Sequence, residues 1–152
     1  MKRLKILNNK EVKGILKLLD NQFGFKDRLD YVFLMNKKNK IYLVNKDIER
    51  IDIDNLRIDA IGLYFGEVNH GSLRLSIEGS QMIGKRVRKN IVELGKEDAE
   101  LWSMGNDIDK EFNVYGFVIL KHKKDFIGCG KYKEGKIFNY VPKERRLRVV
   151  SS

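Results

Sequence analysis

The sequence has a single cysteine, Cys129, and only two histidines, His70 and His122, which lie far apart along the chain. One cysteine cannot form an internal disulfide and cannot by itself supply a thiolate metal site. Because imidazole and thiol ligands are so scarce, we expect no metal centre.

Long apolar runs are also missing. No stretch approaches the roughly 20 apolar residues that a membrane-spanning helix needs. The first residues, MKRLKILNN, lack the apolar segment of a secretory signal. We therefore expect a cytoplasmic protein that has no membrane partner.

The sequence also lacks the glycine-rich turn between a strand and a helix that a methyl-transferring enzyme would use for its cofactor. Gly128-Cys129-Gly130 resembles a fragment of a dinucleotide fingerprint, but it lies between two β segments. Cys129 as a nucleophile would need His122 of the same hairpin as its base. A small buried residue in a strand is the better interpretation of Cys129, so we expect neither a cofactor nor an enzyme.

Acidic residues at Lys46–Asn55 raise the question of acid–base chemistry. Glu49, Asp52 and Asp54 are mixed there with Lys46 and Arg50, and no second cluster accompanies them. A solvated surface is therefore favoured over a catalytic site.

Positive charge is abundant. The formal net charge is +10; residues 1–70 carry 14 Lys and Arg against 10 Asp and Glu, and residues 71–152 carry 17 against 11. An excess of this size favours polyanionic partners such as nucleic acid. A lysine-rich proteome would give the same net charge. The clustering of the charges along the chain therefore has to decide between this explanation and a polyanionic partner.

The basic residues cluster in three places, Lys85–Lys89, Lys121–Lys124 and Lys143–Arg148. The first cluster is a loop between a helix predicted over Ser76–Ile83 and a strand predicted over Ile91–Leu94, and such a loop can bind phosphates. The second lies at a hairpin turn, where solvation alone explains lysines. Since a barrel brings distant strand ends together, two or three clusters could share one face.

The remaining chain predicts a mixture of helices and strands. A capping box from Asn8 to Glu11 and a glycine at Gly24 bound one helix, and Lys96–Met104 predicts another. Hairpins and short strands are predicted over 2–7, 31–35, 41–44, 56–68, 113–121, 126–132 and 137–141. Gly14 inside the first helix suggests close packing, and a boundary is expected at Asn69-His70-Gly71.

Three segments of the second half share a recognisable order of helix, basic loop and glycine-containing hairpin: SLRLSIEGSQMIG, AELWSMGNDID and YGFVILKHKKDFIGCGKYKEGKIFNYVPKERRL. Over roughly Gly71–Val149 the chain resembles the PUA domain, a small β-barrel RNA-binding module. It is most similar to PUA-like domains related to archaeal RNA cytosine-5 methyltransferases of the Sun family, and to stand-alone two-domain ribosome-biogenesis proteins.

The resemblance implies an α+β fold: a small α/β N-terminal domain, residues 1–70, followed by a PUA-like mixed β-barrel with two short helices, residues 71–150. It also implies an RNA-contact face at the basic loop and the final strands. The matching positions are Gly84, Lys85, Arg86, Arg88, Lys89, Lys143, Arg145 and Arg146. Asn106-Asp107-Ile108-Asp109 departs from the proline-glycine pair of many family members, and its acids make that edge a poor RNA surface.

Aromatic residues leave two interpretations open. Trp102 could stack on a base, but a single tryptophan on a short amphipathic helix is more often a core anchor. Tyr115, Tyr132 and Tyr140 could also stack on bases, although barrel packing explains most of them.

Two functions follow from these patterns. The first is an RNA-binding protein in rRNA or tRNA maturation and ribosome biogenesis, which binds structured RNA through a basic face and works beside an RNA methyltransferase or a pre-ribosomal protein. The second is a protein-interaction adaptor for an RNA-modification enzyme, with no RNA site of its own.

Overall fold

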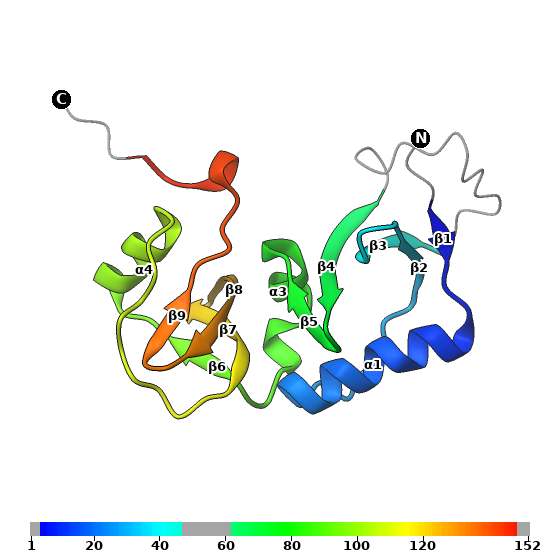
Figure 1. The fold of residues 1–152 in the computed structure, drawn as a ribbon, viewed down its shortest axis with the longest axis horizontal. Coiled ribbons are helices and arrows are strands. Elements are labelled where there is room, and N and C mark those ends of the chain that lie inside the picture. The colour runs from blue at the N-terminus through cyan, green and yellow to red at the C-terminus, as the bar shows by residue number, and fades with distance from the viewer. Residues whose placement is uncertain (1–3, 47–61, 149–152) are drawn as a thin grey trace.

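The computed structural model describes residues 4–46 and 62–148, and it has the α+β fold that the sequence predicts. Figure 1 shows two sheets side by side, with helix α3 between them and helix α1 running along the N-terminal sheet. The charged run at 47–55 and the first part of the strand predicted at 56–68 lie outside the described residues.

The N-terminal sheet is antiparallel, with five strands in the order β1-β2-β3-β4-β5. Its elements, with α1 between the first two strands, are β1 Lys5–Ile6, α1 Asn9–Phe23, β2 Tyr31–Met35, β3 Lys40–Asn45, β4 Leu63–Asn69 and β5 Ser72–Leu75.

Helix α1 begins and ends as the sequence predicts. The Asn8 side chain accepts a hydrogen bond from the backbone N–H of Glu11, and the Glu11 carboxylate accepts one from the Asn8 N–H. Gly24 ends the helix in the left-handed conformation, with φ of 63°. Ile15, Leu19 and Phe23 bury the apolar face in the core of the N-terminal sheet.

The C-terminal sheet is mixed, with four strands in the order β6-β7-β8-β9; β6 and β7 are parallel and the other pairs are antiparallel. Two short helices and two 3-10 turns surround it. The elements are α3 Ile77–Ile83, η2 Gly84–Arg86, β6 Ile91–Glu93, α4 Lys96–Ser103, β7 Gly116–His122, β8 Asp125–Lys133, β9 Lys136–Phe138 and η3 Lys143–Arg145.

Trp102 is the centre of the C-terminal core and is fully buried, which confirms its role as a core anchor and leaves no ring face for a base. Two glycines of β8 make room for its indole. A Cβ at Gly128 would lie 3.3 Å from the indole Nε1, and a Cβ at Gly130 would lie 2.6 Å from the far edge of the ring. Gly128-Cys129-Gly130 is therefore explained by packing around Trp102.

The two sheets share buried side chains. Ile119, Phe126 and Cys129 of the C-terminal sheet belong to the same apolar cluster as Phe23 and Phe65. The boundary predicted at 69–71 falls in the turn of the β4–β5 hairpin, so β5 pairs with the N-terminal sheet. The division into two domains stays a prediction, and the change of sheet comes after Leu75.

Two details differ from expectation. Gly14 is exposed and no atom lies within 4 Å of where its Cβ would be, so it does not mark close packing. Leu101, an apolar residue that the amphipathic pattern of Lys96–Met104 places inward, is 41% exposed, because Trp102 and Ala99 take the inner face of α4.

Candidate nucleic-acid interface

A groove of about 500 Å³ lies between α3, the β7–β8 turn and the C-terminal tail. One basic residue from each of the three charged clusters lines it: Lys85, Lys124 and Arg145. Its apolar walls include Phe126 and Leu147. The groove thus combines cations that can bind phosphates with apolar surface that can contact a base or a ribose.

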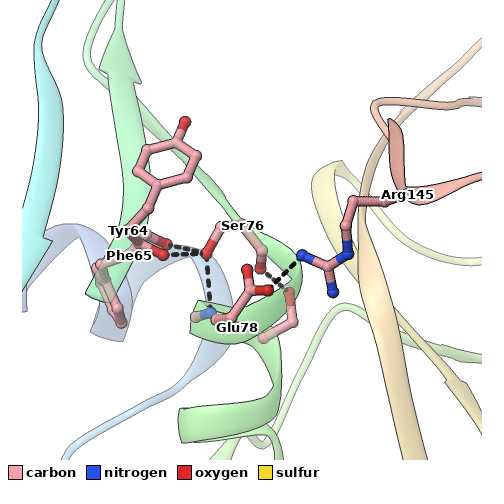
Figure 2. Close-up of polar contacts among 7 residues, drawn as sticks. Tyr64, Phe65, Ser76, Glu78 and Arg145 are labelled. Carbon is pink, nitrogen blue, oxygen red and sulfur yellow. Dashed lines mark hydrogen bonds and ion pairs between the residues drawn. The ribbon is translucent and has the colours of Figure 1, made fainter. Parts of the chain in front are cut away.

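Arg145 is held at the groove by an ion pair with Glu78, from the first turn of α3 (Figure 2). The start of α3 is itself fixed, because the Ser76 hydroxyl caps the helix through the N–H of Gly79 and donates to the carbonyl oxygens of β4. The pair joins the tail to α3 and neutralises the charge of Arg145. Because both side chains of this ion pair are well exposed, we expect the pair to add little to the stability of the fold.

Lys85 and Lys124 supply the uncompensated charge. Both are exposed, and neither makes an ion pair within residues 4–46 and 62–148. Asp125 also lines the groove and reduces its positive potential. Lys85 was predicted as an RNA contact, whereas Lys124 was interpreted as a solvated turn residue.

Gly84 is buried and not exposed at the loop surface. A Cβ at this position would lie 2.4 Å from the ring of Phe126, so only glycine lets the chain pass here. Gly84 therefore packs against Phe126, and this close packing brings the next residue, Lys85, to the groove.

The rest of the basic loop lies beside the end of α1 and the residues that follow it. Arg86 pairs with Asp27 at 2.9 Å and lies 5.2 Å from the centre of the Phe25 ring. The backbone N–H groups of Arg88 and Lys89 both donate to the carbonyl of Phe23, at the end of α1. The loop is therefore divided, and only Lys85 of its four cations lines the groove.

The tail residues also have different surroundings. Arg146 is half-buried; its Nε donates to the carbonyl of Val141 at 3.0 Å, and its side chain fills the space above Gly105. It anchors the tail to α4. Lys143 is exposed on η3 and makes no ion pair among the residues that the structure describes.

The alternative nucleophile, Cys129, is buried, and this burial raises the pKa of its thiol to about 12. The Nδ1 of its candidate base, His122, lies 2.9 Å from the carbonyl oxygen of Leu94. Within the described ranges, no group of three His, Cys, Asp or Glu residues could hold a metal ion. No helix in these ranges has the length and apolar character to cross a membrane.

The three tyrosines considered as base contacts differ in their exposure to solvent. The Tyr132 hydroxyl accepts a hydrogen bond from the N–H of Phe112, so packing explains this residue. Tyr115 is 87% exposed and Tyr140 is 40% exposed, which packing does not explain. The sequence names all three tyrosines as possible base contacts, but it cannot separate the two exposed rings from Tyr132, because strand alternation does not show where a sheet face opens to solvent.

Comparison with known proteins gives these surfaces a context. Residues 89–147 match the family model described as the methyltransferase RsmF PUA domain. This range contains Lys124 and Arg145 of the groove but begins after Lys85. It is also narrower than the range Gly71–Val149 over which the resemblance was expected.

Relatives with curated descriptions extend the similarity. The ribosomal RNA small subunit methyltransferase F of Aeromonas hydrophila is 29% identical over 136 residues, which is 89% of this chain and 28% of the relative. The Vibrio campbellii protein of the same name is 28% identical, over 90% of this chain and 30% of the relative. The Aliivibrio fischeri protein is 27% identical, over 88% of this chain and 26% of the relative.

Two facts qualify the expected resemblance. These relatives are bacterial, whereas the resemblance pointed to archaeal proteins. The similarity to them also extends beyond the second half of the chain, because an aligned stretch of 136 residues must include part of the N-terminal half. The chain spans less than a third of the length of the relatives. Residues 89–147 are therefore similar to the RsmF PUA domain, and the chain as a whole is a distant, partial relative of the bacterial ribosomal RNA small subunit methyltransferases F.

Proposed function

We propose that this protein binds structured ribosomal or transfer RNA and presents it for modification during ribosome biogenesis or tRNA maturation. The observation that carries the proposal is the convergence of Lys85, Lys124 and Arg145, from three separate clusters, on one groove. The similarity of residues 89–147 to an rRNA methyltransferase PUA domain supports it.

The expected mode of binding follows from the chemistry of the groove. Lys85 and Lys124 bind phosphates as point charges, while Arg145 exchanges part of its contact with Glu78 for a phosphate. The apolar wall contributes contact with a base or ribose. The residues of this chain bind RNA and take no part in methyl transfer; its partners are the RNA and an RNA methyltransferase or pre-ribosomal protein. Such a role fits a protein of the cytoplasm.

The test is a double variant, Lys85→Ala with Lys124→Ala, measured on a structured ribosomal RNA fragment. Each lost charge–phosphate contact should weaken binding roughly tenfold. The slope of log affinity against log salt should fall by about 2, because two fewer counterions are released.

The matched control is Lys10→Ala with Lys13→Ala, which removes the same charge from the exposed face of α1. We expect this variant to keep most of the affinity. Equal losses in the two variants would show that net charge alone binds RNA, and unchanged affinity in the groove variant would leave the adaptor hypothesis. Incubating the protein with RNA and a methyl donor should give no methylated product.

A further inference from the structure

A second surface lies on the C-terminal sheet, at the end away from the groove. Phe117 on β7, Lys131 on β8 and Phe138 on β9 are directly opposite one another in the strand register. Residues opposite one another on neighbouring strands project to the same face of a sheet. These three side chains therefore form one row across three strands.

Two further residues extend this row toward the N-terminal sheet. The Tyr140 ring lies 6.3 Å from the Phe117 ring, and the guanidinium of Arg74, from β5, lies 4.4 Å from the centre of the Tyr140 ring. Glu67 holds Arg74 in place through an ion pair of 2.8 Å. We call these five residues, Arg74, Phe117, Lys131, Phe138 and Tyr140, the aromatic row.

Cations accompany the rings of the aromatic row. The Lys131 Nζ lies 5.6 Å from the centre of the Phe117 ring, and the Lys136 Nζ lies 5.8 Å from the centre of the Phe138 ring. Lys136 also pairs with Asp109 at 3.7 Å, so Lys131 supplies the uncompensated charge of the row. Lys131 is exposed and makes no ion pair within the described part of the chain. Aromatic rings beside a positively charged surface are the means by which proteins bind single-stranded nucleic acid.

The core explains Phe117, which is partly buried against the apolar cluster shared by the two sheets, but it does not explain the other two rings. Phe138 and Tyr140 are 38% and 40% exposed and belong to neither buried cluster. Protein interfaces favour aromatic residues but are depleted in lysine, whereas here Lys131 and Lys136 lie against the rings. Unpaired nucleotides satisfy both parts of the pattern, because bases stack on rings and phosphates bind cations.

We propose that the aromatic row binds unpaired nucleotides of the RNA, with bases stacked on Phe138 and Tyr140 and a phosphate bound by Lys131. This proposal rests on the proposed function and adds to it a second, base-dependent contact. Strand β7 runs from Phe117 at the row to the turn that carries Lys124, about 17 Å at about 3.3 Å per residue. One RNA molecule can therefore reach both surfaces.

The experiment compares a labelled single-stranded RNA of mixed sequence with a strand of the same length whose central nucleotides lack their bases. The variant is Phe138→Leu with Tyr140→Leu, which keeps apolar side chains and removes the rings. Binding is measured by fluorescence anisotropy at two salt concentrations. Each single variant is measured as well, so that the result does not depend on the folding of the double variant.

The wild-type protein should bind the complete strand more tightly than the abasic strand. The double variant should lose about tenfold or more for the complete strand, little for the abasic strand, and keep the wild-type salt slope. Phe138→Trp should retain the affinity, since it retains a ring. The control Leu101→Ala, which removes an exposed apolar side chain on α4, should change nothing.

Other outcomes separate the two proposals. If the double variant binds the complete strand as the wild type does, while Lys85→Ala with Lys124→Ala weakens binding, the aromatic row is not an RNA site and is left to a protein partner. The stacking proposal also fails if the ring variants prefer the complete strand to the abasic strand as strongly as the wild-type protein does. If the wild-type protein binds no RNA, the proposed function itself fails.

Discussion

Gly130 shows how tightly the C-terminal core is packed at the level of a single residue. Its Cβ would lie 2.6 Å from both Ile137 and Trp102 and 2.8 Å from a backbone carbonyl oxygen, so an alanine cannot fit without displacing the strand or the indole. We expect Gly130→Ala to lower the free energy of unfolding by about 1–3 kcal/mol. Chemical denaturation monitored by Trp102 fluorescence measures this change in the free energy of unfolding.

Replacing Gly14 by alanine should stabilise the protein, in contrast to the same substitution at Gly130. This glycine lies inside α1 with nothing near its Cβ position, so an alanine gains helix propensity at no steric cost. We expect a rise in unfolding free energy of about 0.5–1 kcal/mol. A destabilised Gly14→Ala protein would contradict the description of this face of α1 as exposed.

Cys129 allows a prediction about pH. Burial raises the pKa of its thiol from 9.0 to about 12, so the folded state keeps the proton that the unfolded chain loses. Stability should therefore fall as the pH rises from 9 toward 12, and Cys129→Ala should remove that part of the fall. A native thiol that reacts with a disulfide reagent at pH 8 as fast as the denatured protein would contradict this burial.

At the scale of elements, the capping of α1 is the clearest link between sequence and structure. The reciprocal hydrogen bonds of Asn8 and Glu11 satisfy two backbone N–H groups, and the hydrogen bond from Lys5 to Glu11 lowers the pKa of that carboxyl. We expect Asn8→Ala to cost about 1 kcal/mol of stability. Asn8→Asp should cost much less in the same thermal unfolding assay.

The elements were predictable where local chemistry decides them. The Asn8 cap, the stop at Gly24 and the hairpin from Tyr31 to Asn45 depend on neighbours along the chain, and the structure confirms them. Gly66 looks like a strand break in the sequence but lies inside β4, where its missing side chain lets the backbone of Arg74 in β5 approach closely. A glycine that admits a neighbouring strand and one that ends a strand look alike in a sequence.

At the scale of the whole molecule, the fold class could be predicted but the composition of the site only in part. Lys85 and Arg145 were chosen from the sequence, yet Lys124 joins them only because the β7–β8 hairpin brings its turn to α3 and the tail. Arg86 and Arg146 look equally basic in the sequence, but Asp27 and the Val141 carbonyl engage them. Tertiary contacts decide which cations are available, and the sequence does not show those contacts.

The central claim is that the protein recognises structured RNA and is not merely basic. The most direct test measures binding of a structured ribosomal RNA fragment, a single-stranded RNA and a duplex DNA at two salt concentrations. We predict the tightest binding for structured RNA, with an affinity that falls as salt rises and a preference that persists at the higher salt. Equal affinity for all three nucleic acids, or no binding at low salt, would contradict the account.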